Sequence, residues 1–307
     1  MRFSFAESMC DPSHYLPLAI EAERAGFSSM TVPDSLCFPE ASDSKYPYTP
    51  DGNREFLRGK PFLDPFCLIS AMGAVTERLR FTTFVVKLPI RHPVLVAKQA
   101  ASVAVLTGGR FAFGVGLSPW PEDFAVTGTD WKTRGARMDE MIEIVRGLTS
   151  PARDGAAGAG GDARGWRASG FFSHRGEHYQ VPSIEMCPVP AAPIPILIGG
   201  HAEPALRRAA RLGDGWMHAG GDPAELDRCL ARLAELRREA GREREPFEVH
   251  AISLDAYTVD GVRRLEERGV TDVIVGFRNA YEPDTMTLQQ KIDALRAYAD
   301  RVIARVA

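Results

Sequence analysis

The 307-residue chain lacks most features that mark secreted, membrane-spanning or nucleic-acid-binding proteins. Its five cysteines form no C-x-x-C pair and are odd in number, which favours free thiols in a reducing compartment. No apolar run approaches the length of a membrane span, and no signal-peptide pattern is present at the N-terminus. A formal net charge of −3 gives no support for a basic surface that binds nucleic acids or anionic membranes. These absences predict a cytoplasmic protein.

Several catalytic signatures are also missing. The sequence has no G-x-S-x-G elbow, P-loop or H-E-x-x-H motif, so nucleophilic and nucleotide hydrolysis lose support. No G-x-G-x-x-G follows the first strand signal at Arg2–Phe5, and Gly114-Val115-Gly116 lacks the third glycine of that motif. His174 and His178 have a spacing that can bind a metal on a helix, but Gly176 lies between them and their flanks favour strands. We therefore predict no metal site.

The sequence instead alternates strand and helix signals. Within residues 79–120, a β-branched and aromatic run at Phe81–Val86 precedes an apolar-periodic helix at Val94–Leu106. A second strand at Phe111–Val115 ends in Gly116 and a loop of small residues. A crossover of this length joins parallel strands, and ligands bind in the loops that follow such strands.

The same alternation runs along the chain and amounts to roughly eight strand–helix units. It predicts an α/β fold, a (β/α)8 TIM barrel, with a doubly wound sheet as the runner-up. Asp64 and Pro65 predict a helix to about Ala74, with Asp64 as N-cap and Pro65 in the first helical position. Further strands are expected at residues 2–5, 28–32, 194–198, 213–217, 247–254 and 270–275. Further helices are expected at about 13–25, 133–148, 203–212, 223–239, 260–268 and 286–304.

Residues 1–307 are predicted to form a single barrel domain with two insertions. Residues 37–62 contain several Pro, Gly, Tyr and Asp residues and are too long for a passive connection, so we predict an active-site loop or lid. Residues 151–170 are poor in large apolar residues and rich in Gly, Ala and Arg, which predicts a flexible surface insertion.

In a barrel, working residues belong at the C-terminal ends of the strands. Five such ends stand out, namely Asp34, residues 82–88, 116–118, 199–202 and 276–279. In the loop at 199–202, two glycines allow close approach of a ligand, and the helix beginning near Glu203 presents free N–H groups. This loop is either a phosphate site or a plain tight turn. Asp34 either hydrogen-bonds a ligand or caps its own turn.

Five segments of the chain together carry a resemblance to a known family. They are similar, in the same order, to segments of the bacterial luciferase-like flavin and deazaflavin oxidoreductases, a superfamily of (β/α)8 barrels. The segments are residues 62–81, 88–116, 122–140, 171–182 and 194–216. Tyr46-Pro47-Tyr48 with Asp51-Gly52 looks most like the branch that depends on coenzyme F420.

The resemblance implies roles for residues around the cofactor ring. In the family, the Asp after the second strand contacts the flavin or deazaflavin, and Asp34 matches it. A bulged third strand, often with a non-proline cis peptide, supports the ring, and the match falls near Thr82, Thr83 and Phe84. The loop after the fourth strand lies along the ring and ribityl chain, and the Gly-Gly loop binds the phosphate. The matching residues are Gly116, Leu117 and Ser118 for the first loop and Gly199, Gly200, His201 and Ala202 for the second.

One departure concerns the catalytic acid. Many deazaflavin members have His directly after the matching Asp, and in some it donates a proton, whereas here Ser35 stands in that place. A serine with an ordinary pKa is a poor general acid near neutral pH. The candidate catalytic residues are therefore Asp34, Ser35 and Glu122, with Asp123, His201, solvent or the substrate as other proton sources. Glu122 either serves the chemistry or caps the following segment.

The resemblance implies an oxidoreductase that transfers a hydride between reduced coenzyme F420 and a small organic substrate. One alternative is a two-component monooxygenase that uses FMNH2, supplied by a separate reductase. Another is a barrel that binds a flavin without catalysis. The resemblance also implies a homodimer, and neither nucleic acid nor a membrane is expected as a partner.

Overall fold

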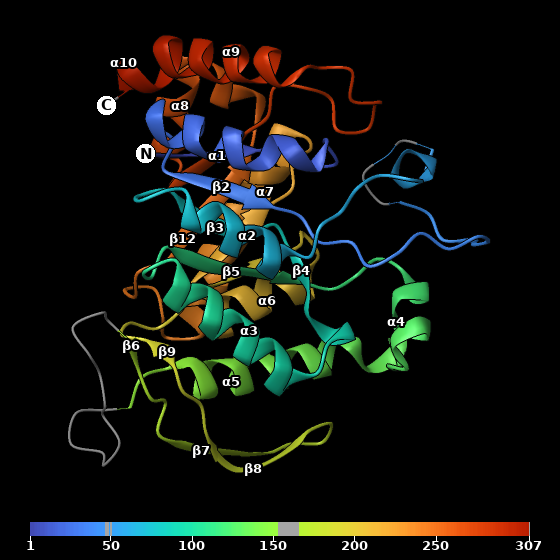
Figure 1. Ribbon diagram of the computed structural model, residues 1–307. Helices are drawn as coiled ribbons and strands as arrows, with labels where there is room; N and C mark the ends of the chain where they lie inside the picture. The colour runs from blue at the N-terminus through green and yellow to red at the C-terminus, as the bar shows by residue number, and fades with distance from the viewer. Residues whose placement is uncertain (47–48, 50, 153–165, 307) are drawn as a thin grey trace.

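A computed structural model describes residues 1–46, 49, 51–152 and 166–306 (Figure 1). Eight strands of the described residues form a closed parallel barrel, because β1 pairs with both β2 and β13 while β5 pairs with both β3 and β10. The predicted TIM barrel is confirmed. In chain order the barrel strands are β1 (Arg2–Ala6), β2 (Ser29–Val32), β3 (Arg80–Thr83), β5 (Phe111–Gly116), β10 (Ile196–Gly199), β11 (Gly215–His218), β12 (Glu248–Ile252) and β13 (Asp272–Val275).

Helices surround the strands (Figure 1) and bury their apolar faces against the outside of the barrel. The helices that follow the strands are α1 (Tyr15–Arg24), α2 (Pro65–Ala74), α3 (Pro93–Leu106), α5 (Arg134–Thr149), α6 (Glu203–Leu212), α7 (Pro223–Glu239), α8 (Val259–Glu267) and α9 (Leu288–Tyr298). Two shorter helices are α4 (Pro121–Thr127) and α10 (Ala304–Val306). No helix among the described residues is long and apolar enough to cross a lipid bilayer.

The start of α2 follows from local chemistry. The Asp64 carboxylate accepts the backbone N–H groups of Phe66 and Cys67 at 2.9 and 3.0 Å, and Pro65 occupies the first helical position. The Asp64 carboxylate gives a partner to two backbone N–H groups that the helix itself leaves unpaired, and Pro65 has no N–H that needs a partner. The predicted N-cap and the predicted end at Ala74 are both confirmed.

The barrel interior is filled at its N-terminal end. The Glu248 carboxylate forms ion pairs with Arg2 at 2.6 Å and with Arg80 at 3.4 Å, and it contacts His250 at 2.7 Å. Above these groups lies a buried apolar cluster of Ala112, Leu197, Met217 and Ile274. The C-terminal mouth is thus the end of the barrel at which a site can form.

Some expected elements differ from the structure. The expected strand at 81–86 is divided into β3 and β4 (Val86–Lys87), because the chain leaves the sheet at Phe84 and Val85 and rejoins it against β5. The expected helix at 13–25 begins with a 3-10 turn (Pro12–His14). The expected final helix ends earlier, because a π-helical turn (Ala299–Ile303) follows Tyr298.

Two small antiparallel pairs are absent from the expected strands, although the flanks of His174 and His178 were expected to favour strands. They are β7 (Phe171–Arg175) with β8 (Gln180–Glu185), and β6 (Trp166–Arg167) with β9 (Val189–Pro190). His174 lies in the first pair, 3.3 Å from Glu140, and the Glu140 carboxylate also accepts the backbone N–H of His178 at 3.0 Å. Within the predicted insertion at 151–170, residues 153–165 lie outside the described residues, as do Pro47 and Tyr48.

Candidate functional site

The third strand bulges where it reaches the mouth of the barrel. β3 ends at Thr83, and the peptide bond between Phe84 and Val85 is cis although neither residue is proline. The non-proline cis bond implied near Thr83–Phe84 therefore occurs one bond further along. Phe84 and Val85 are half-buried and pack on the apolar cluster inside the barrel. The bulge thus forms the floor of the mouth.

Glycines on two neighbouring strands make room for this bulge. A Cβ atom on Gly116 would lie 2.7 Å from Val85 Cγ2, and one on Gly199 would lie 2.9 Å from Val85 Cγ1. A Cβ atom on Gly114 would lie 1.8 Å from the Thr83 carbonyl oxygen. The structure therefore gives Gly116 and Gly199 a packing role at the rim, which sequence reasoning did not foresee. It also places Val85 directly beside the Gly-Gly loop.

Asp34 joins the end of β2 to the bulge. Its carboxylate accepts the backbone N–H of Lys87 at 2.9 Å and a two-point ion pair from Arg91 at 2.9 and 2.8 Å. The side chain is only 3% exposed. Such a charge-assisted pair has a rigid geometry. Asp34 therefore orients the loop after β2, and Ser35 lies half-buried beside it.

A second buried pair joins β4, which directly follows the bulge, to α4. The Lys87 ammonium is 2.7 Å from Asp123 Oδ2, and Ser118 donates its hydroxyl proton to the same oxygen at 2.5 Å. Ser118 Oγ in turn accepts the backbone N–H of Trp120 at 3.0 Å. The predicted residue Ser118 thus holds the wall of the mouth in place, and Leu117 packs against the barrel core.

Glu122 holds the segment at 37–62 against α4. Its carboxylate accepts hydrogen bonds from the hydroxyls of Ser42 and Ser44 and lies 3.5 Å from the Arg54 guanidinium. Burial alone would raise the pKa of Glu122, but these donors lower it below its usual value. Glu122 is therefore a carboxylate near neutral pH. Figure 1 shows this segment and α4 on the same side of the barrel.

An aromatic cluster reinforces the same contact. The Tyr46 ring stacks on Trp120 with centroids 5.6 Å apart, and the Arg54 guanidinium lies 4.5 Å from the centre of the Trp120 ring. Phe56 and Tyr281 meet edge to face at 4.9 Å, so the cluster also reaches the loop after β13. Tyr46, Arg54 and Phe56, from the described part of the segment at 37–62, therefore pack along the rim of the mouth.

Thr82 and Thr83, which were predicted to support the cofactor ring, have their hydroxyl groups within hydrogen-bond distance of neighbouring strands of the barrel. The Thr83 hydroxyl donates to the Gly114 carbonyl at 2.7 Å, and the Thr82 hydroxyl lies 3.4 Å from that of Ser29. Both threonines are almost fully buried. Of the three residues predicted in this strand, Phe84 is the one that is partly exposed at the mouth.

The Gly-Gly loop (residues 199–202) leads into α6, and no side chain caps the start of that helix. Gly200 has a φ of +121°, a conformation that favours glycine, and its carbonyl accepts the indole N–H of Trp216 at 2.8 Å. Ala202 occupies the N-cap position and has no side-chain acceptor for the first turn of α6. Pro204, in the second helical position, has no N–H, and the Ala205 N–H donates to the Ala202 carbonyl at 2.8 Å. The donors that the loop can offer a ligand at this positive helix end are therefore the backbone N–H groups up to Glu203.

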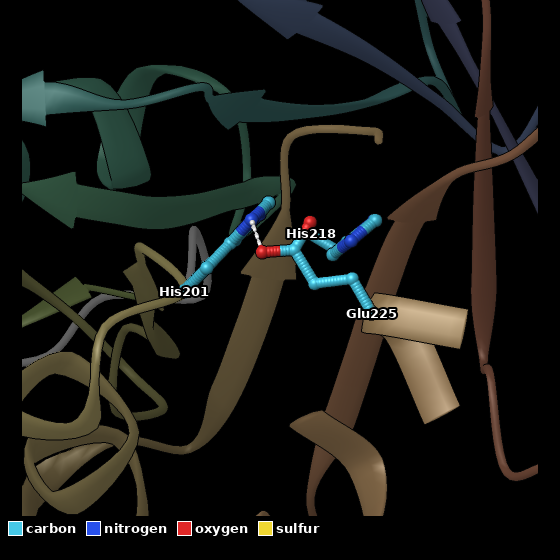
Figure 2. Close-up of side chains that lie close together, drawn as sticks. All are labelled: His201, His218 and Glu225. Carbon is cyan, nitrogen blue, oxygen red and sulfur yellow. Dashed lines mark hydrogen bonds and ion pairs between the residues drawn. The ribbon is translucent and has the colours of Figure 1, made fainter. Parts of the chain in front are cut away.

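His201 of this loop belongs to a further group of side chains (Figure 2). Its ring stacks on His218 with centroids 4.4 Å apart and planes 9° apart, and its Nδ1 lies 3.3 Å from Glu225 Oε1. Burial, together with the neighbouring His201, lowers the pKa of His218 from 6.5 to about 4. His218 is therefore neutral at neutral pH.

The ends of β1 and β13 carry a balanced buried network. Arg278 Nε donates to Glu7 at 2.8 Å, and Lys291 Nζ lies 3.3 Å from Glu7 and 2.5 Å from Asp284. The strand end at 276–279 was predicted to carry working residues. In the structure Arg278 is held by carboxylates within the rim.

Sequence reasoning missed Arg91 and His218, and it included Lys87 in the strand end at 82–88 without assigning it a role. One signal was present, because Lys87 directly follows an apolar strand and a lysine in that position must find a partner when it is buried. The pairing of these residues depends on contacts between strands that are distant in sequence.

Comparisons with known proteins agree with this architecture. Residues 6–289 match the sequence model of the luciferase-like monooxygenase family. The uncharacterized protein Rv0940c of Mycobacterium tuberculosis is 59% identical over the full length of both chains. The F420-dependent glucose-6-phosphate dehydrogenase of Nakamurella multipartita is 26% identical over 87% of this chain and 71% of its own.

Among solved structures, monooxygenase RslO1 from Streptomyces bottropensis has a TM-score of 0.74 at 17% identity, with both chains fully covered. At this identity the likeness establishes the fold alone. The family membership of the chain rests on the match of residues 6–289 to the family model, and the closed barrel agrees with it. The chain belongs to the luciferase-like monooxygenase family of oxidoreductases.

Proposed function

We propose that the chain is an oxidoreductase that binds coenzyme F420 at the C-terminal mouth and transfers a hydride between it and a small organic substrate. The observation that carries the proposal is the contact between the bulge and the Gly-Gly loop through Val85. This contact puts a floor suited to a flat ring directly beside a loop suited to a phosphate. The F420-dependent relative supports the choice of cofactor.

The residues at the phosphate end fit such a cofactor. The backbone at Gly200 adopts a conformation that a Cβ atom would strain, and Ala202 leaves the first turn of α6 without a side-chain cap. Backbone N–H groups at a helix start are suited to a phosphate. F420 and FMN both carry a phosphate near the ring, so this end of the site accommodates either.

The chain's own residues would orient the ring and exclude water. When bound, the deazaflavin supplies the hydride chemistry. Phe84 and Val85 would support one face of the ring, and the Asp34–Arg91 pair would hold the loop beside it. Glu122 is ionised near neutral pH and holds the segment at 37–62, so we assign it a positioning role. With Ser35 a poor acid, a proton would come from solvent or substrate.

A fluorescence titration of the purified protein with F420 and with FMN tests this proposal. We expect saturable binding of F420 at micromolar concentrations and weaker binding of FMN. Binding of neither cofactor at tens of micromolar would reject the proposal. Light scattering of the same sample checks the homodimer that we propose with it.

A flavin-dependent monooxygenase is the second candidate, favoured by the family's description and by the likeness to RslO1. The deazaflavin ring lacks N5 and favours hydride transfer over oxygen activation. Oxygen uptake with FMNH2 and a panel of small organic substrates distinguishes the two. Tighter FMN binding with substrate-dependent oxygen uptake would favour the monooxygenase.

A further inference from the structure

Three side chains with metal-binding atoms meet beside the mouth of the barrel (Figure 2). His201 lies in the loop after β10, His218 ends β11, and Glu225 lies in the first turn of α7. Their ligand atoms all lie within 4.8 Å of one another. They come from three separate elements, so the barrel and not a local motif brings them together.

His218 adds an independent observation that points to a ligand. Its side chain is 1% exposed, and its Nε2 atom has no hydrogen-bond partner among the described residues. Its Nδ1 lies 3.4 Å from the Ile252 carbonyl and 3.3 Å from the Gly220 nitrogen. These contacts favour opposite tautomers, but in either one Nε2 stays unpartnered. A buried polar atom without a partner is costly, and a bound ion would satisfy it.

We propose that His201, His218 and Glu225 bind a divalent transition-metal ion such as Zn²⁺. Two imidazole nitrogens and one carboxylate oxygen are a common donor set for this ion. A hydrogen bond from His218 Nδ1 to the Ile252 carbonyl is the second contact that metal-bound imidazoles usually make. Three protein ligands leave a fourth position for water or an anion.

Binding requires a local rearrangement. The two rings are stacked with nearly parallel planes, so their lone pairs do not converge on one point. The His201 ring would turn about its Cβ–Cγ bond and exchange its contacts with Glu225 and the Ala219 N–H for the metal. Terminal torsions of this kind are soft, and the Glu225 side chain is 35% exposed, so its carboxylate can move with the ring.

The test uses the full chain, stripped with EDTA and titrated with Zn²⁺ alone by calorimetry, followed by the absorption spectrum of the Co²⁺ form. We expect one ion per chain and Co²⁺ bands of a low-coordinate site. His218→Gln and Glu225→Gln should each weaken binding at least tenfold. The matched control is His174→Gln, because His174 lies at the same 3.3 Å from a glutamate but belongs to no such three-residue group among the described residues. It should bind like the parent chain.

The absence of a stoichiometric Zn²⁺ site in the parent chain would overturn the proposal. So would parent-like affinity in both site variants, or an equal loss in the control. In those cases the three residues are a packed imidazole pair with a hydrogen-bonded glutamate. His218 is buried and its replacement risks misfolding, so Glu225→Gln, at a partly exposed position, keeps the test decisive. No cofactor is added, so failure here leaves the proposed function untouched.

Discussion

The Lys87 ammonium lies 2.7 Å from the Asp123 carboxylate, and the two side chains are only 8% and 2% exposed. A buried pair of this kind is strongly destabilised when one partner alone is removed, because the other charge is left uncompensated. The pair joins the bulge after β3 to α4 and so holds two sides of the candidate site together.

Asp123→Asn should therefore lower the free energy of unfolding by about 3–5 kcal/mol. The double variant Lys87→Met with Asp123→Asn should lose less than the sum of the two single variants, because no unpaired charge remains. Urea unfolding of the four proteins measures this coupling. Additive losses would show that the two groups do not interact in solution.

A second prediction concerns the glycines beside the bulge. Gly116→Ala should destabilise the fold by about 1–3 kcal/mol, because its Cβ would meet Val85 Cγ2 at 2.7 Å. Adding Val85→Ala removes that methyl group and should recover part of the loss. Gly135→Ala is the control, since the nearest atom to its Cβ is 3.5 Å away. Thermal unfolding of the two single glycine variants and the double variant measures these effects. If Val85→Ala recovers no stability, the packing of Gly116 against Val85 is contradicted.

A third prediction concerns pH and the segment at 37–62. The folded protein lowers the pKa of Glu122 below 4.5, so the stabilising contribution of its carboxylate is complete above that pH. It is lost as the pH falls through the folded pKa. Protection of the backbone amides at residues 42–46, measured as exchange relative to the intrinsic rate at each pH, should fall over that range. Glu122→Gln should exchange faster at neutral pH and show a weaker pH response.

The control for this experiment is Glu77→Gln, because Glu77 is 88% exposed and lies 4.0 Å from its nearest cationic group. Its exchange profile at residues 42–46 should match that of the parent chain. A parent-like profile in Glu122→Gln would instead show that other contacts hold the segment.

A fourth prediction follows from the proposed phosphate loop. Ala202→Asp places a carboxylate at the uncapped start of α6, which should stabilise the helix by about 0.5–1 kcal/mol. The same carboxylate competes with a phosphate for the N–H groups at this helix start and repels it. FMN affinity should fall at least tenfold, whereas riboflavin, which has no phosphate, should bind as before. An equal loss for both ligands would place the phosphate elsewhere.

Features whose physical causes lie within a few neighbouring residues could be predicted from the sequence. Asp64 and Pro65 predicted the start of α2 because an N-cap acts on the next three residues. Alternating apolar segments predicted the barrel, since each strand and helix must bury one face. The segment at 81–86 was predicted as one strand because Phe84 and Val85 have strong strand preferences. The division of this segment into β3 and β4 depends on the separate pairing of β4 with β5, which strand preferences do not predict.

The set of polar groups that forms the candidate site depends on contacts between residues far apart in the sequence. Asp34 and Arg91 are 57 residues apart, and Lys87 and Asp123 are 36 apart. Glu122 meets Ser42 from 80 residues away. These groups become neighbours only when barrel closure brings the C-terminal ends of the strands together. No local pattern encodes those distances, because side-chain pairing across a barrel depends on the register and packing of all its strands.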